Sequence, residues 1–127
     1  MIEQEYFTPK IEDLFIGYEC EWYGQATRKT IKVTKWQPFK IISSNNISPT
    51  VVKNLRTPYL TKEQIENEDW IFTQQIGNTL FFKKKDFELT FNTNRIEINN
   101  FGEYDLGYWG NCKDINTFRY ICKLLEI

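Results

Sequence analysis

The sequence predicts an α+β fold in a single domain over residues 1–127, built mainly from an antiparallel sheet of meandering hairpins. Several segments alternate apolar and polar residues with the period of two that marks a half-buried strand. Two-residue turn signatures separate neighbouring segments of this kind. The final segment instead follows the spacing of an amphipathic helix, which we expect to pack on the sheet.

The first predicted hairpin joins residues 14–23 to residues 30–36, with a turn between them. Its first strand alternates apolar and polar side chains, which favours one buried and one solvated face. The residues expected on the buried face are Ile16, Tyr18, Cys20 and Trp22. Pro38 is expected to end the second strand, since proline cannot serve a sheet ladder. Residues 39–42 are then a third strand, and the turn-rich residues 43–49 are a surface loop.

A short central helix is predicted over residues 61–68. Thr61 and Gln64 stand at the two positions of a capping box, in which each side chain bonds the other residue's backbone N–H. Leu60 and Ile65 occupy the two positions of a hydrophobic staple. These local signals predict where the helix begins.

Two further hairpins follow the helix. Their predicted strands are residues 70–76, 79–84, 87–92 and 95–100. Gly77-Asn78 and Thr93-Asn94 are the two-residue turns that connect them. Residues 101–110 fit either an aromatic strand or a glycine-punctuated loop.

A C-terminal helix is predicted over residues 114–127. Asp114 is a good N-cap residue, because its carboxylate can accept hydrogen bonds from the first free backbone N–H groups. The apolar stripe is Ile115, Phe118, Cys122 and Leu125, widened by Ile121. This stripe is the face that we expect to cover the sheet.

The composition excludes several classes of chemistry. Histidine is absent, which removes the usual general base, histidine-ligated zinc and histidine-activated nucleophiles. Phosphate-binding glycine loops and nucleophile elbows are also absent from the sequence. Glu19 and Glu21 are close enough on one strand for a two-carboxylate hydrolase or a hard metal ion, but they are more typical of a solvated face. We therefore expect no enzyme activity, no cofactor and no metal.

Compartment and thiol state follow from similar arguments. No apolar run is long enough to span a membrane, and glutamates stand where a signal peptide needs positive charge, so we expect a cytoplasmic protein. Three cysteines without a CxxC pair are expected to be free thiols. Cys20 and Cys122 fall on apolar faces and should be buried, whereas Cys112, two residues after a glycine, is expected to be more exposed.

Charge is unevenly distributed along a chain whose net charge is −1. Residues 28–62 hold eight basic residues and no acidic one, whereas residues 1–27 hold six acidic residues and one basic residue. Basic residues interleaved with aromatic ones suit single-stranded nucleic acid. The residues of this alternative site are Lys29, Lys32, Lys35, Trp36, Lys40 and Arg56. The competing interpretation is that the basic strands pair with the acidic strand before them.

An aromatic, glycine-rich stretch offers the leading binding hypothesis. Tyr104, Tyr108 and Trp109 cluster there, and exposed tyrosine and tryptophan are typical anchors of protein interfaces. A charge-complementary rim is expected from Glu63, Glu66, Glu68 and Asp69. The competing interpretation is an aromatic strand that covers one end of the core. We expect a protein partner, with nucleic acid as the alternative and no membrane partner.

Three segments carry a resemblance to known proteins: IEDLFIGYECE (11–21), TPYLTKEQIENEDW (57–70) and GNCKDINTFRYICKLLEI (110–127). In order and spacing the chain resembles a group of uncharacterised small cytosolic proteins from gut Bacteroidetes and the phages that infect them. The resemblance implies no activity, cofactor or catalytic residue. It implies a small accessory protein of phage or mobile-element type that binds a host or phage protein, with a defence inhibitor as one form.

Overall fold

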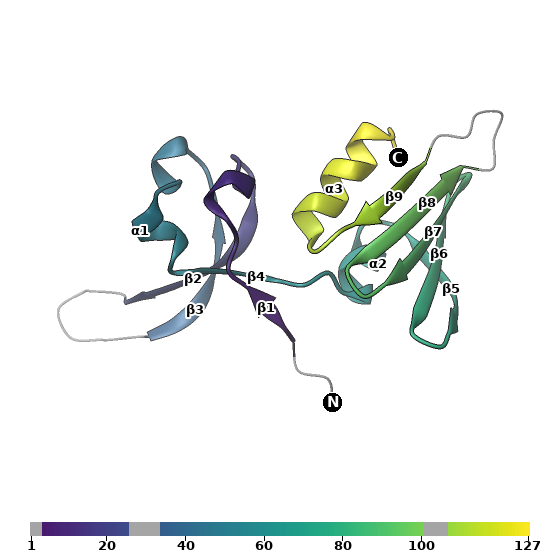
Figure 1. Ribbon diagram of the computed structural model, residues 1–127, viewed down its shortest axis with the longest axis horizontal. Coiled ribbons are helices and arrows are strands. Elements are labelled where there is room, and N and C mark those ends of the chain that lie inside the picture. The colour runs from purple at the N-terminus through teal and green to yellow at the C-terminus, as the bar shows by residue number, and fades with distance from the viewer. Residues whose placement is uncertain (1–3, 26–33, 101–106) are drawn as a thin grey trace. The chain divides into compact units, whose positions relative to one another are not determined.

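The computed structural model describes residues 4–25, 34–100 and 107–127, and it confirms an α+β fold with antiparallel sheets and a C-terminal helix (Figure 1). The strands belong to two sheets, and the chain divides into two compact units, Met1–Pro58 and Tyr59–Ile127. Each unit is described by itself below. The organisation of residues 1–127 as one domain stays a prediction.

The first unit contains a four-stranded antiparallel sheet, called here the N-terminal sheet, with the strand order β1-β4-β2-β3. Its strands are β1 (Tyr6–Phe7), β2 (Glu19–Gln25), β3 (Thr34–Lys40) and β4 (Leu55–Pro58). Short helical turns at Ile11–Asp13 and Ser44–Asn46 and the helix α1 (Pro49–Val52) connect them. The buried apolar residues are Leu14, Tyr18, Cys20, Ile41, Val52 and Leu55.

The strand predicted over residues 14–23 begins later, at Glu19. Gly17 has a φ of 100°, a left-handed conformation that interrupts the extended backbone before the strand. Ile16 is consequently 66% exposed, although the alternation placed it on the buried face. Tyr18 is buried as predicted, and its hydroxyl lies 2.8 Å from the Thr57 hydroxyl.

Two other expectations for this unit are wrong. Pro38 does not end a strand, because β3 runs through it; β3 is an edge strand, where proline is tolerated. The separate strand predicted over residues 39–42 is absent, because residues 39 and 40 belong to β3. The loop predicted at residues 43–49 contains the turn Ser44–Asn46 and leads into α1, whose N-cap Ser48 accepts a hydrogen bond from the Val51 backbone N–H. Strand β4, which the sequence patterns did not indicate, then pairs with both β1 and β2.

The second unit contains a five-stranded antiparallel meander, called here the C-terminal sheet, whose strands follow chain order (Figure 1). Its strands are β5 (Ile71–Ile76), β6 (Thr79–Lys84), β7 (Phe87–Asn92), β8 (Arg95–Asn100) and β9 (Tyr108–Asn111). The predicted turns at Gly77-Asn78 and Thr93-Asn94 are confirmed. Helix α2 (Lys62–Asn67) begins at the predicted capping box, since Thr61 and Gln64 exchange both hydrogen bonds, at 3.1 and 3.2 Å.

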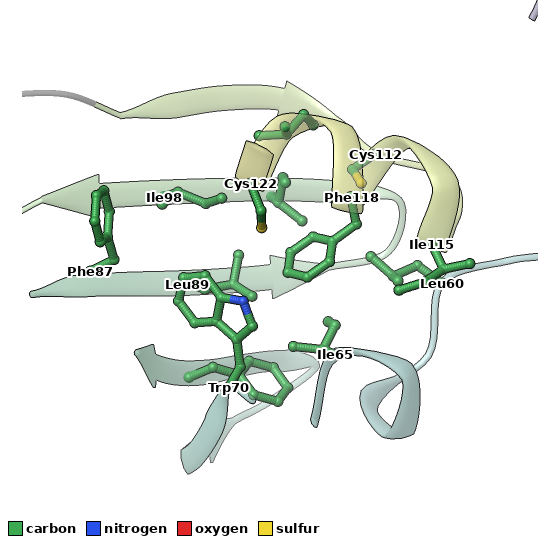
Figure 2. Close-up of a cluster of buried hydrophobic side chains, with 13 residues drawn as sticks. Leu60, Ile65, Trp70, Phe87, Leu89, Ile98, Cys112, Ile115, Phe118 and Cys122 are labelled. Carbon is green, nitrogen blue, oxygen red and sulfur yellow. The ribbon is translucent and has the colours of Figure 1, made fainter. Parts of the chain in front are cut away.

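The core of this unit lies between one face of the C-terminal sheet and helix α3 (Ile115–Leu124) (Figure 2). Phe118 on α3 is fully buried, and its ring centroid lies 6.1 Å from that of Trp70. Asp114 caps α3 as predicted, accepting a hydrogen bond from the Asn116 backbone N–H. Because α3 covers only one face, the other face of the sheet carries the exposed side chains.

Candidate functional site

The candidate site is the face of the C-terminal sheet that points away from α3. The strand register aligns Phe81 with Thr90, Thr90 with Glu97, and Glu97 with Trp109. Neighbouring residues in each strand point to opposite faces, and Ile96 and Ile98 on either side of Glu97 are buried in the core. The row that includes Thr90, Glu97 and Trp109 therefore lies on the outer face.

Trp109 is the dominant apolar group of this face. Its side chain is 72% exposed, although it belongs to a strand that is hydrogen-bonded to β8. The Arg95 guanidinium carbon lies 5.1 Å from the centroid of the indole ring, within cation–π range. Among the residues that the structure describes, no carboxylate lies within 4.0 Å of the Arg95 guanidinium. The arginine is thus available to a partner while it remains beside the tryptophan.

A hollow of about 390 Å³ adjoins Trp109. Its lining residues are Thr90, Asn92, Thr93, Arg95, Ile96, Glu97 and Trp109, and we call this set the Trp109 face. The lining offers hydroxyl, amide and carboxylate groups as well as a guanidinium, so it can donate and accept hydrogen bonds beside one large aromatic surface.

Thr93 gives the rim of this hollow an unusual backbone. Its φ is 33°, and Asn94 follows at 63°, so both central residues of the β7–β8 turn are left-handed. Asparagine tolerates this conformation, whereas a β-branched residue is strained in it. Strain of this kind collects at functional positions, where the side chain is retained despite its cost.

Tyr108 does not share a face with Trp109. It pairs with Ile98 and packs against the core, and its hydroxyl donates a hydrogen bond to the Asn111 carbonyl oxygen at 2.8 Å. Gly110 makes room for this arrangement, because a Cβ there would lie 3.0 Å from the Tyr108 hydroxyl. Desolvation, followed by the neighbouring Cys112, raises the pKa of Tyr108 above its ordinary value. Tyr108 is therefore a supporting residue for β9, and Tyr104 lies outside the described residues.

The acidic residues expected to form a rim lie on α2 and the turn after it. Glu63 is exposed, while Glu66 pairs with Lys62 at 3.2 Å. Glu68 pairs with Arg119, and Asp69 occupies the turn with a φ of 69°. None of these residues lines the hollow beside Trp109. The structure does not bring this set together with Trp109 on one surface.

The basic residues of the alternative site are only partly described. Lys29 and Lys32 lie outside the described residues, as does the side chain of Lys35. Lys40 is exposed, and its ammonium nitrogen lies 3.6 Å from a carboxylate oxygen of Glu19 on the adjacent strand. This pairing follows the interpretation in which the acidic strand neutralises the basic strand.

Arg56 and Trp36 are close together on the outer face of the N-terminal sheet. The Arg56 guanidinium carbon lies 4.3 Å from the centroid of the Trp36 ring and 3.6 Å from that of Tyr6. The same guanidinium forms an ion pair with Glu21 at 2.7 Å. Because Tyr23 also packs on Trp36, at 5.1 Å between centroids, the aromatic surface here is engaged within the unit.

The carboxylates considered for catalysis or metal binding, and the three cysteines, are engaged in contacts or buried within their own units. Glu19 and Glu21 each have a cationic partner, and within residues 4–25, 34–100 and 107–127 no three potential ligands converge to hold a metal ion. All three cysteines are buried, including Cys112, which was expected to be more exposed. Burial raises the pKa of Cys20 to about 11 and that of Cys122 to about 11.

Sequence reasoning singled out Trp109 but missed the residues around it. Thr90, Asn92, Arg95 and Glu97 stand on the polar side of predicted strands, which by itself indicates only a solvated face. These polar residues could have been recognised because they lie on two strands joined by a predicted hairpin, next to a segment that carries an aromatic residue.

Neither a family model nor a curated protein nor a solved structure matches the chain. In the part of the chain that the structure describes, no helix is long and apolar enough to cross a membrane. The site is therefore interpreted from its own geometry.

Proposed function

We propose that this protein is a non-enzymatic binding module that holds a protein partner on the Trp109 face. The observation that carries the proposal is the tryptophan itself, 72% exposed on a regular strand beside a polar hollow. Contacts by tryptophan and arginine supply much of the affinity in protein interfaces, especially when surrounding groups exclude water.

The lining suits a polypeptide. An apolar side chain of the partner can pack on the indole, while Thr90 and Asn92 offer hydrogen bonds to peptide groups. Arg95 and Glu97 supply one charge of each sign, which favours a partner with a complementary arrangement over a strongly acidic or basic one.

The resemblance to small proteins of gut Bacteroidetes and their phages supplies the biological form of the proposal. In that form the protein is a cytoplasmic accessory protein of phage or mobile-element type, and its partner is a host or phage protein. Inhibition of a host defence protein is one mode of action. Blocking a surface of the partner would require binding alone and no chemical step.

Substitution of Trp109 tests the proposal. Tagged wild-type protein and Trp109→Ala are purified from nuclease-treated host lysate, and the affinity of the recovered partner is then measured with purified components. We expect Trp109→Ala to weaken the complex by at least about 2 kcal/mol, roughly thirtyfold. Tyr120→Ala is the matched control, because Tyr120 is an aromatic residue on α3 that is 57% exposed. Equal affinity of a folded Trp109→Ala protein would contradict the proposal.

Single-stranded nucleic acid is the alternative partner, through the basic residues of segment 28–62. Under that alternative, an oligonucleotide quenches Trp36 fluorescence and its affinity falls steeply with salt. The ion pairs of Lys40 and Arg56 reduce the positive charge available for it. Recovery of nucleic acid only when nuclease is omitted, without a protein partner, would replace the protein-binding proposal.

A further inference from the structure

The free edge of β9 is a second feature of the Trp109 face. β9 is the last strand of the C-terminal sheet, and among the described residues it pairs with β8 alone. Just beyond β9, the Cys112 backbone N–H donates to the Asn94 carbonyl oxygen at 2.7 Å. Because bonded and non-bonded pairs alternate along an antiparallel ladder, Gly110 is bonded to β8, whereas Trp109 and Asn111 are not. The main-chain N–H and C=O groups of Trp109 therefore face the free edge.

The hairpin of β7 and β8 gives the same alternation. Asn92 and Arg95 flank its two-residue turn and form the bonded pair that closes such a hairpin. Glu97, the residue opposite Trp109, is then bonded to β7 rather than to β9. Two separate starting points thus leave the main chain of Trp109 without a bond to β8.

The other three sheet edges carry features that hinder pairing with another chain. β5 has a bulge between Phe72 and Gln74, β3 contains Pro38, and β1 is two residues long. β9 is four residues long and contains no proline, no charged residue and no register shift. Proteins use bulges, prolines, charges and very short strands to keep sheet edges from pairing. Of the four edges, β9 is therefore the one best able to accept a further strand.

Helix α3 places an exposed apolar side chain on the same side of the unit as β9. On one flank of α3, Arg119 pairs with Glu68, whose carbonyl oxygen accepts a hydrogen bond from Lys84 of β6. With 3.6 residues per turn, Arg119 lies about 100° to one side of the buried Phe118, and Leu124 lies about 120° to the other side. Leu124 is 65% exposed. Because β9 lies at the opposite end of the sheet from β5 and β6, Leu124 is on the flank of α3 toward β9 (Figure 1).

An extended peptide segment fits both features at once. Its main chain can pair with the free groups of Trp109, which is the interaction that gives affinity when a strand is added to a sheet edge. Its side chains then alternate between the two faces of the sheet, one beside the Trp109 indole and the next toward Leu124. β9 itself has no charged residue, and the neighbouring Arg95 and Glu97 carry opposite charges. The chemistry therefore fits an uncharged segment with apolar side chains.

We propose that an extended segment of the protein partner adds to β9 as a further strand of the C-terminal sheet. The Tyr108 hydroxyl already donates to the Asn111 carbonyl oxygen, so the added strand bonds to the N–H and C=O of Trp109 and to the N–H of Asn111. One apolar side chain of the segment packs on the indole, and a neighbouring one packs on Leu124. The inference rests on the proposed function, because it names the part of the partner that the Trp109 face holds.

A synthetic peptide serves as the probe. Random peptides about twelve residues long are displayed and selected on the full-length protein, and the tightest binder is synthesised together with variants N-methylated at one amide each. Every second N–H of an added strand faces β9. We therefore expect N-methylation to weaken binding about tenfold at alternate positions and by less than about twofold at the positions between them. A peptide bound as a helix, or through side chains alone, would not show this period of two.

Amide hydrogen exchange reports on the edge in the unaltered protein. The Trp109 amide should exchange rapidly in the free protein, because it has no bond to β8, whereas the Gly110 amide should exchange slowly. Saturation with the peptide should slow exchange of the Trp109 amide at least about tenfold, because that amide gains a ladder bond. The Gly110 amide should stay slow throughout.

Two substitutions at one position separate the backbone from the side chain. Asn111→Pro removes an N–H that faces the free edge, and proline is tolerated in edge strands. It should weaken peptide binding at least about tenfold, whereas Asn111→Ala keeps the N–H and should bind within about twofold of the wild type. Circular dichroism checks the fold of both variants. If Asn111→Pro does not fold, the N-methylated peptides test the same bonds from the side of the ligand.

Several results would overturn the inference. They are a selection that yields no peptide dependent on Trp109, N-methylation without a period of two, a Trp109 amide that is already protected in the free protein, and equal binding by folded Asn111→Pro and Asn111→Ala. If the partner recovered from lysate still loses affinity with Trp109→Ala in these cases, the proposed function stands without strand addition. Unchanged affinity of that partner for Trp109→Ala would remove the proposed function itself.

Discussion

Each sheet carries an arginine beside a tryptophan on the face away from its core, and the two pairs differ in what else the arginine contacts. Arg56 lies 4.3 Å from the Trp36 ring, and it also has the Tyr6 ring at 3.6 Å and Glu21 at 2.7 Å. Arg95 lies 5.1 Å from the Trp109 ring, with no ion-pair partner among the described residues. Arg56 and Trp36 thus have further partners within their own unit, whereas the Arg95 guanidinium has no carboxylate partner among the described residues.

The comparison shows that composition alone does not identify a binding surface. Segment 28–62 has the stronger charge and a comparable aromatic content, yet two of its described cations, Lys40 and Arg56, are paired with carboxylates of β2. The Trp109 face has a mixed charge and less conspicuous sequence features. A candidate surface is better recognised by interactions that the unit leaves unmade than by the residue types it contains.

The largest expected effect tests the premise that the inner face of the C-terminal sheet supplies stability. Phe118→Ala removes a fully buried ring that packs on Trp70, and should lower the free energy of unfolding by about 3–5 kcal/mol. Chemical denaturation measures the change. Tyr120→Ala, on the exposed side of the same helix, should change it by less than about 0.5 kcal/mol. Similar losses for both variants would break the distinction between inner and outer faces.

The next prediction compares the two arginines directly. Arg56→Met leaves Glu21 without its ion-pair partner and removes the stacking on two rings, so we expect a loss of about 1–3 kcal/mol in unfolding free energy. Arg95→Met should cost less than about 0.5 kcal/mol, because the residue is exposed. Chemical denaturation of the two variants measures and compares the two losses of unfolding free energy. Equal costs would mean that Arg95 is as much a structural residue as Arg56.

Two of the three thiols, Cys20 in the first unit and Cys122 in the second, give a prediction in which the two units should behave alike. Burial raises the pKa of Cys20 to about 11 and that of Cys122 to about 11, so both stay protonated in the folded protein where the unfolded chain ionises. The unfolded state then binds fewer protons, and stability should fall as the pH rises from about 9 toward 11, by about 2 kcal/mol per thiol.

Chemical denaturation at pH 8 and pH 10 tests whether stability falls as the pH rises. Cys20→Ala and Cys122→Ala should each be less stable than the wild type at pH 8 yet lose less stability on going to pH 10. The folded wild-type protein should also react slowly with a thiol reagent at pH 8, because thiolates are scarce and buried. A pH dependence that is unchanged in both variants would mean that these thiols do not titrate as expected.

Local signals in the sequence predicted local structure well. The capping box of Thr61 and Gln64, the N-cap Asp114 and the turn at Gly77-Asn78 depend only on neighbouring residues, and each is present. Gly17 and Pro38 were the exceptions among local features. A period-two pattern does not show where one glycine leaves the extended conformation, and proline is tolerated in the edge strand β3. The wrong prediction that Ile16 is buried follows from the left-handed backbone of Gly17.

The sequence patterns could not predict arrangements that depend on contacts between distant parts of the chain. The sequence of strand β4 (Leu55–Pro58) shows little alternation of apolar and polar residues. The place of β4 between β1 and β2 depends on pairing with segments that are distant in the chain. The division of the strands between two sheets depends on such pairing as well. Tyr108 and Trp109 illustrate the remaining limit: once residues 108–111 are known to be a strand, alternation itself separates the two rings onto opposite faces.

The smallest predicted effect sharpens the contrast between the two faces at a single backbone position. Thr93 is a β-branched residue at a φ of 33° beside the hollow, and asparagine tolerates that conformation better. Thr93→Asn should therefore raise the free energy of unfolding by about 0.5–1 kcal/mol in chemical denaturation. Thr79→Asn is the control, because Thr79 lies in an extended strand, where asparagine is unfavourable and no gain is expected. If Thr93→Asn also weakens the partner complex, the threonine is retained for binding; a destabilised Thr93→Asn protein would instead show that the turn is not strained.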